Sequence, residues 1–356
     1  MKKHNFSAGP SILPQPVFKE AAEAAINFNH LDLSILEISH RSKDFVAVLD
    51  ETTQLTKEML NLGDDHDVLY LSGGASSQFF MVPMNYLDEN QSACYLDTGT
   101  WSTKAIKEAV HFGQIQTIAS SKDQNYNYVP KSYDVDPTAK YLHLTSNNTI
   151  FGTQLHALPD TDVPIVCDMS SDIMSRPLSI ERYGIIYAGA QKNLGPAGVT
   201  LVIIRKDWAE RAKRVIPTML NYQTHIAKDS CFNTPPVFPI YVMMLNLRWL
   251  KKNGGLAGIN QRNTQKSSLV YHEIDRNPLF TGTAAHEDRS KMNVTFLLNN
   301  ADLDQAFLDM CTEAGVVNIK GHRSVGGFRA SMYNAMGMEG AEALVEVMKS
   351  FEAKYG

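Results

Sequence analysis

The sequence predicts an α/β protein in two parts: a large domain with a mainly parallel, seven-stranded sheet flanked by helices, and a smaller α+β domain after it. Three observations support this fold class. Apolar or β-branched runs alternate with amphipathic helical patterns through the first two-thirds of the chain, which is typical of a parallel sheet covered by helices on both faces. The pattern changes after Gly254-Gly255. The length of 356 residues, 44% of them hydrophobic, is enough for more than one core.

Seven short apolar or β-branched runs are the expected strands of the large sheet. They span residues 67–71, 93–96, 115–119, 141–144, 165–167, 185–188 and 200–204. Apolar residues at helical spacing predict helices over residues 17–28, 42–60, 76–86, 101–112 and 236–252.

The second part begins with a helical pattern over residues 256–276 that stops before Pro278 and is expected to bridge the two domains. Strands then follow at 292–298, 316–319 and 328–333, with helices at 303–314 and 339–354. We therefore place the large domain at residues 14–255 and the small domain at 256–356, joined by the N-terminal segment 1–13.

Composition excludes several classes of protein. The net charge of -5 is spread along the chain without a block of like charges, which argues against a nucleic-acid or membrane-surface role. The N-terminus has no apolar stretch of the signal-peptide type, so we expect a cytoplasmic protein. The four cysteines lie far apart with no paired spacing, so neither a metal site nor a disulfide framework is expected.

Lys192 is the residue that first indicates a chemistry. It follows the run 185–188 among amides, glycines and apolar residues, and Asp168 ends another apolar run upstream. Loss of hydration lowers the pKa of an amine, as a Schiff-base lysine requires. An acid at the end of an adjacent strand suits the pyridinium nitrogen of pyridoxal phosphate. The pair predicts a pyridoxal-phosphate site, although a turn lysine and a helix-capping Asp would look the same.

Other polar or aromatic residues also follow predicted strands. Ser72 to Phe79 joins a strand to a helix through small residues and could cradle a phosphate. Trp101 follows the predicted strand 93–96 and could stack on a cofactor ring. The segment 147–153 follows the predicted strand 141–144. Because ligands bind at the carboxyl ends of strands in open α/β sheets, these residues map to one edge of the sheet.

Two His-Arg pairs form a second group of candidates. His40-Arg41 lies near the N-terminus, while His322-Arg323 lies in a glycine-rich segment with Arg329 shortly after it. Arginine binds carboxylate or phosphate in a bidentate manner, and a neighbouring histidine can add a charged donor. The pairs therefore suggest a doubly anionic substrate. Further along, Thr234 is expected simply to cap the helix that starts at the two following prolines.

Taken together, these segments resemble the phosphoserine aminotransferase family nearly end to end. The longest matching strings are Tyr187-Ala188-Gly189-Ala190-Gln191-Lys192-Asn193 and Gly321-His322-Arg323-Ser324, with further matches at residues 5–10, 39–42, 73–74, 168–171 and 233–236. The resemblance implies the fold type I architecture of pyridoxal-phosphate-dependent transferases and a homodimer with active sites at the subunit interface. It also implies reversible transamination of O-phospho-L-serine with 2-oxoglutarate in serine biosynthesis, with the phosphorylated hydroxythreonine of vitamin B6 synthesis as a further candidate substrate.

The resemblance also implies roles for the cofactor-binding residues. Lys192 would hold the cofactor as an internal aldimine and move a proton between the substrate Cα and the cofactor, and Asp168 would keep the pyridine nitrogen protonated. Trp101 would stack on the ring, and Thr149 would lie near its phenolic oxygen. The cofactor phosphate would be bound by Ala75, Ser76 and Gln191, together with Asn233 and Thr234 from a second subunit.

The substrate-binding roles follow in the same way. The resemblance implies that Arg329 binds the α-carboxylate of the amino acid. The side-chain phosphate, or the side-chain carboxylate of glutamate, would be held by His40, Arg41, His322 and Arg323.

Other functions stay open at the level of the residues alone. A different small amino-acid aminotransferase could use the same fold, but it would leave His322 and Arg323 without a phosphate. A desulfurase would need a nucleophilic cysteine in a mobile loop, and none is evident. A nucleotide-binding oxidoreductase could use Gly73-Gly74, although the full Gly-x-Gly-x-x-Gly spacing is missing. A non-catalytic dimeric binding protein is the last alternative.

Overall fold

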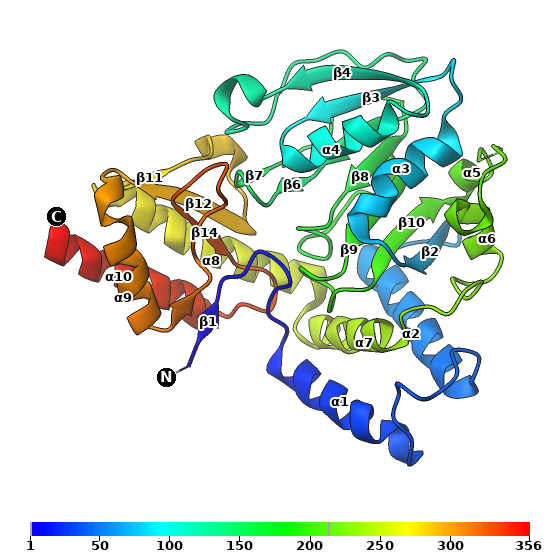
Figure 1. Ribbon diagram of the computed structural model, residues 1–356, viewed down its shortest axis with the longest axis horizontal. Helices are drawn as coiled ribbons and strands as arrows, with labels where there is room; N and C mark the ends of the chain where they lie inside the picture. Colours follow the sequence, from blue (N-terminus) through cyan, green and yellow to red (C-terminus); the bar gives the residue numbers. More distant parts are fainter. Residues whose placement is uncertain (1, 213) are drawn as a thin grey trace.

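The centre of the protein is a seven-stranded sheet in the order β2-β10-β9-β8-β5-β3-β4 (Figure 1). The computed structural model describes residues 2–212 and 214–356. Only β10 runs antiparallel to its neighbours, so the prediction of a mainly parallel sheet is confirmed. The strands are β2 (His66–Leu71), β3 (Ser92–Asp97), β4 (Gln114–Ser120), β5 (Leu142–Thr145), β8 (Ile165–Asp168), β9 (Tyr183–Gly189) and β10 (Thr200–Arg205).

The alternation of side chains along each strand supplies a core on both faces of this sheet. In β9, Ile186 and Ala188 pack on one face, whereas Ile185 and Tyr187 pack on the other. A strand with a period of two that is buried throughout must be apolar on both faces. The first face is covered by α1 (Gln15–Ile26), α2 (Lys43–Leu60) and α7 (Val237–Lys252), and the second by α3 (Gly74–Tyr86) and α4 (Thr100–Ala109).

Helix α7 begins later than the sequence suggested. Pro236 occupies its N-cap position, so the expectation that Thr234 caps this helix is wrong. The physical reason is that Thr234 and Pro235 each precede a proline, which disfavours the helical region for both residues. Thr234 is therefore free of any capping role in α7 and is exposed.

A second, smaller sheet has its own core. Its strands β11 (Phe280–Gly282), β12 (Asn293–Leu298) and β14 (Phe328–Ser331) are antiparallel, and Phe280, Phe296 and Phe307 pack edge to face beneath them. The helices α9 (Asp304–Glu313) and α10 (Met338–Tyr355) complete this core. Strand β13 (Val316–Val317) is shorter than expected because Asn318 is left-handed (φ 61°), and it pairs with β1 (His4–Asn5).

Shorter elements were not predicted from the sequence, since two to five residues carry too little periodicity. They are β1, β11, β6 (Asn147–Asn148), β7 (Thr153–Gln154), α5 (Lys206–Ala209), α6 (Tyr222–Ile226) and the 3-10 turns Phe28–His30, Lys122–Gln124, Ile180–Arg182, Thr218–Leu220, His286–Asp288 and Ala301–Leu303. Within the described ranges, none of the helices has the length and apolar character needed to cross a bilayer.

Helix α8 (Gly255–Arg276) connects the two cores. Leu256 and Ile259 at its start belong to the core of the large sheet, whereas Val270 and Ile274 belong to the second core. Between them Lys266, only 1% exposed, donates hydrogen bonds to the backbone carbonyls of Met332, Tyr333 and Met336 at 3.1, 2.8 and 2.9 Å. One ammonium thus ties the bridging helix to the loop after β14.

Replacing Lys266 by Met should lower the free energy of unfolding by about 3 kcal/mol, because three buried carbonyls lose their donor while only part of that loss is offset by removing a desolvated charge. Urea unfolding of the cofactor-bound protein would measure the change. Lys19→Met at an exposed position of α1 is the control and should shift stability by less than about 0.5 kcal/mol. Equal stability of the two variants would contradict the role of Lys266.

Candidate active site

The carboxyl ends of several strands open into one cavity of about 430 Å³. Thr145 ends β5 and Asp168 ends β8, and the two residues are paired across these neighbouring strands. Gln191 and Lys192 follow β9, while the first turns of α3 and α4 follow β2 and β3. Because all these strands run in the same direction, residues distant in sequence meet at this edge.

Lys192 reaches into this cavity as a half-buried amine. Its Nζ donates a hydrogen bond to Thr149 Oγ1 at 2.7 Å and lies 5.8 Å from the centroid of the Trp101 ring. Burial lowers the pKa of Lys192 to about 8; the charge of Asp168 opposes the shift and that of Arg329 adds to it. A substantial neutral fraction near pH 8 is what a nucleophilic amine needs.

The start of the chain packs against Lys192. The backbone N–H of Ser11 donates to the carbonyl of Gln191 at 2.9 Å, and the Ser11 hydroxyl donates to the carbonyl of Lys192. Gly9 has a φ of 139°, and a Cβ at this position would lie 3.2 Å from Lys192 Cγ. Glycine is therefore required both by the backbone conformation and by the close approach. The Tyr333 hydroxyl holds this segment from the other side by donating to the Ala8 carbonyl at 2.8 Å.

Asp168 is the buried carboxylate of the cavity, with 5% of its surface exposed. Its Oδ1 accepts a hydrogen bond from the backbone N–H of Ser170 at 2.9 Å. Burial raises the pKa of Asp168, while the Ser170 hydrogen bonds and the charge of Lys192 act against the increase. The position suits a carboxylate that must face a cation inside the cavity.

Trp101 is placed by the start of α4. The Ser102 hydroxyl accepts hydrogen bonds from the backbone N–H groups of Thr98 and Gly99, both at 2.9 Å, and donates to Asp97 Oδ1 at 3.1 Å. This network fixes the strand-to-helix turn, so the indole faces the cavity from the first helical turn. Its Nε1 is buried and has no hydrogen-bond partner among the described residues.

The mouth of the cavity carries cations. Arg329 Nη1 donates to the Thr149 carbonyl at 3.4 Å, and His322 lies beside it in the lining. Burial, followed by the charges of Arg329, Arg323 and Lys104, lowers the pKa of His322. The described ion pairs include none of Arg329, Arg323 and Lys104, so the cavity is prepared for an anionic ligand.

Five candidate residues do not line this cavity. Asn233 and Thr234 line a separate one of about 270 Å³, next to Gly73. Arg41 lies near the same segment, since its charge acts on the thiol of Cys231, whose pKa is raised by burial. The candidates outside the Lys192 cavity are His40, Arg41, Asn233, Thr234 and Arg323, whereas those in its lining are Ala75, Ser76, Trp101, Thr149, Asp168, Gln191, Lys192, His322 and Arg329.

Sequence reasoning missed several lining residues. Thr145 and Ser170 come at or just after strand ends, so the strand-end rule could have found them. Lys104 could have been found from its position three residues after Trp101 on the same helix. Ala8 and Gly9 carry no local signal, because only the tertiary fold brings the N-terminus to Lys192.

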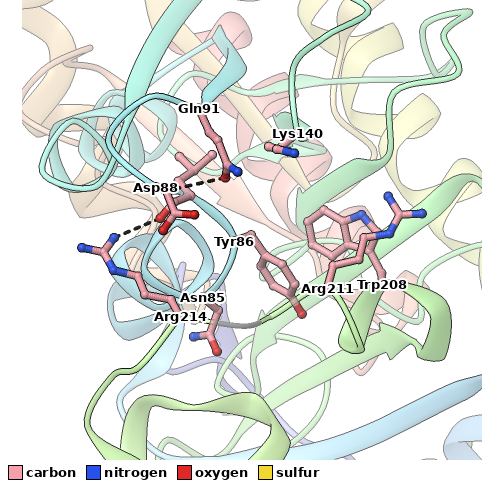
Figure 2. A pocket seen from close by; sticks show the side chains of 9 residues that line it. Asn85, Tyr86, Asp88, Gln91, Lys140, Trp208, Arg211 and Arg214 are labelled. Atoms are coloured by element: carbon pink, nitrogen blue, oxygen red, sulfur yellow. Dashed lines mark hydrogen bonds between the residues drawn. The ribbon is translucent and has the colours of Figure 1, made fainter.

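Another cavity of similar volume lies at the C-terminal end of α3 (Figure 2). Tyr86 stacks on Trp208 there at 4.1 Å between ring centroids, and Arg214 donates to the carbonyl of Leu87 at 2.9 Å. None of its described lining residues belongs to the candidate set. The lining consists of Asn85, Tyr86, Leu87, Asp88, Gln91, Lys140, Trp208, Arg211 and Arg214. The chemistry therefore concentrates in the Lys192 cavity.

Comparison with known proteins agrees with this geometry. The class-V aminotransferase family matches residues 3–344. A phosphoserine aminotransferase of Flavobacterium psychrophilum is 57% identical over 99% of this chain and 100% of its own length. The chain belongs to the phosphoserine aminotransferases, within the class-V aminotransferase family. A member from Parabacteroides distasonis is 56% identical over 100% of both chains.

Solved structures of this family superpose closely on the chain. The phosphoserine aminotransferase of Bacillus circulans subsp. alkalophilus has a TM-score of 0.97 at 44% identity, covering 100% of this chain and 99% of that one. A pyridoxal-phosphate-bound member from Trichomonas vaginalis has a TM-score of 0.94 at 37% identity, covering 98% and 100%. The fold type I architecture, the aminotransferase class and the pyridoxal phosphate cofactor are thus shown for this chain.

The residues of the cavity fit this cofactor. Lys192 offers an amine with a lowered pKa, and Asp168 offers a buried carboxylate for a pyridine nitrogen. The N-terminal turn of α3 presents Gly74, Ala75 and Ser76, whose backbone N–H groups have no intrahelical partner and suit a phosphate.

In the cofactor-free enzyme, two variants should move the pKa of Lys192 from about 8 in opposite directions. Asp168→Asn removes a charge that favours the ammonium and should lower this pKa, whereas Arg329→Gln removes a repelling cation and should raise it. The pH dependence of Lys192 modification by an amine reagent, followed by peptide mass spectrometry, measures both. Shifts of the same sign in the two variants would refute this electrostatic balance.

Proposed function

We propose that the chain catalyses the reversible reaction of O-phospho-L-serine with 2-oxoglutarate, giving 3-phosphohydroxypyruvate and L-glutamate. One observation carries the proposal: a single cavity holds an amine and a carboxylate suited to pyridoxal phosphate beneath a mouth of cations. Both amino-acid substrates are anionic at two ends, which this mouth can match. The relatives from Flavobacterium psychrophilum and Parabacteroides distasonis, both phosphoserine aminotransferases, support the same reaction.

In this proposal Lys192 is the proton carrier. Pyridoxal phosphate, when bound, supplies an electron sink for the electrons of the substrate Cα–H bond. The neutral Nζ of Lys192 would take the proton from Cα and pass it to the cofactor carbon, a role that a pKa of about 8 favours. Thr149 orients this amine through its 2.7 Å hydrogen bond, and Asp168 stabilises the proton on the ring nitrogen. Trp101, which lines the cavity, would cover the ring and exclude water.

The anionic groups of the substrate are assigned to the basic residues. Arg329 binds the α-carboxylate, because its guanidinium lies in the cavity and is held at the Thr149 carbonyl. His322 binds the side-chain phosphate from the same mouth, with Arg323 beside it. The side-chain carboxylate of glutamate takes the place of the phosphate in the reverse direction.

We further propose a homodimer with shared active sites. His40, Arg41, Asn233 and Thr234 lie outside the Lys192 cavity, with Arg41 close to Cys231, so they can complete such a site only in another copy of the chain. Exposed apolar side chains also lie in the segment before α2 and in its first turn: Leu31, Leu33, Leu36 and Val46 are 40%, 47%, 64% and 42% exposed. Burial of such a patch is a general driving force for association.

The division into domains at residues 14–255 and 256–356, with segment 1–13 on the smaller one, is also our proposal. The separate cores and the pairing of β1 with β13 support it. A cytoplasmic location is supported by the free thiols of Cys94, Cys167, Cys231 and Cys311, which suit a reducing compartment.

Lys192→Ala should remove the visible band of the cofactor-bound enzyme and lower turnover by more than about 1,000-fold, because the amine that holds the cofactor and carries the proton is lost. Arg329→Ala should instead weaken binding of phosphoserine and glutamate alike, by about 10- to 100-fold in KM, since both share the α-carboxylate. Absorption spectra and coupled assays measure these effects. Full turnover by Lys192→Ala, or a loss confined to phosphoserine in Arg329→Ala, would contradict the assignments.

Mixed dimers test the shared sites. Arg41→Ala and Lys192→Ala chains should each be nearly inactive alone, but their co-expression should restore about a quarter of the wild-type activity, because half of the dimers are mixed and each holds one intact site. Differently tagged chains allow the mixed dimer to be purified before the assay. If Arg41 acted in the same chain as Lys192, both sites of the mixed dimer would be damaged and no activity would return.

A further inference from the structure

Lys104 is a cation in the lining of the Lys192 cavity that has no role in the proposed reaction. It lies on α4 three residues after Trp101, so the two side chains share one face of the helix. Its Nζ stands 4.7 Å from the centroid of the Trp101 ring, and its side chain lines the same cavity as Lys192, His322 and Arg329. Lys104 is also exposed at the mouth, where an entering substrate must pass.

The surroundings of Lys104 leave its charge uncompensated. Lys104 takes part in none of the ion pairs of the described residues, unlike Lys251, which pairs with Glu58 at 2.7 Å, and Lys349, which pairs with Glu346 at 3.0 Å. Lys104 instead has the Trp101 ring as a neighbour, which can hold an ammonium without neutralising it. The positive charge of Lys104 also acts on His322, where burial and the charges of Arg329 and Arg323 act in the same direction and lower the pKa of the ring. A cation held among cations is stabilised when an anion enters.

We propose that Lys104 is a specificity-determining residue that contacts the substrate phosphate and favours a phosphorylated side chain over a carboxylate. The inference rests on the proposed function and assigns one more group to the same site. A phosphate monoester carries about two negative charges above its second pKa of about 6, whereas the side-chain carboxylate of glutamate carries one. The Coulomb energy of attraction to a compact ammonium is therefore about twice as large for the phosphate as for the carboxylate. The bidentate Arg329 matches the α-carboxylate common to both substrates and cannot make this distinction.

The test measures binding without turnover on the cofactor-bound enzyme. 3-Phosphoglycerate and glutarate resemble phosphoserine and glutamate but have no amino group, so neither can react. In Lys104→Gln, calorimetry at pH 8 should show binding of 3-phosphoglycerate weakened about tenfold and binding of glutarate about threefold. Lys104→Arg should restore most of the preference. Lys107→Gln, on the same helix but outside the cavity, should leave both affinities within about twofold of wild type.

Equal losses for both ligands in Lys104→Gln, or no loss for either, would overturn the proposal. A changed visible band of the bound cofactor in Lys104→Gln would also overturn it, because Lys104 would then act by placing Trp101. A wild-type assay with phosphoserine as amino donor tests the proposed reaction separately from the phosphate contact of Lys104. If wild-type enzyme binds 3-phosphoglycerate through Lys104 yet fails to convert phosphoserine, the proposed reaction is wrong while the phosphate contact stands.

Discussion

The shared direction of six strands is the constraint on which the site depends. β2, β9, β8, β5, β3 and β4 all end at one edge of the sheet, and only β10 returns from it. Burying polar side chains inside the sheet would cost free energy, whereas at its edge such side chains can face a common cavity. The paired ends of β5 and β8, Thr145 and Asp168, show how strand register sets the positions of functional groups to within one residue.

Electrostatics then decides what the cavity can do. Burial alone disfavours the charge on both Lys192 and Asp168, and each limits the shift in the pKa of the other. Arg329 tips this balance toward a neutral amine. The cations at the mouth are thus part of the tuning of Lys192 as well as a site for anions, and an entering anion changes both.

The second core contributes to the chemistry through a few long-range contacts. Arg329 comes from β14, and the Tyr333 hydroxyl after it holds the Ala8 carbonyl of the N-terminal segment that packs on Lys192. Lys266 ties α8 to the loop after β14 through three carbonyls. The position of Arg329 relative to Lys192 therefore depends on contacts between parts of the chain that are far apart in sequence.

The sequence by itself determined the elements and the chemistry of the reactive residues. All seven strands of the large sheet and the long helices lie where periodicity predicted them, because burial on both faces demands continuous apolar runs. Tertiary structure alone decided which residues share one cavity. It brought Gly9 against Lys192 and left His40, Arg41, Asn233 and Thr234 elsewhere. Local propensity carries no information on such contacts, since they arise only when distant segments pack together.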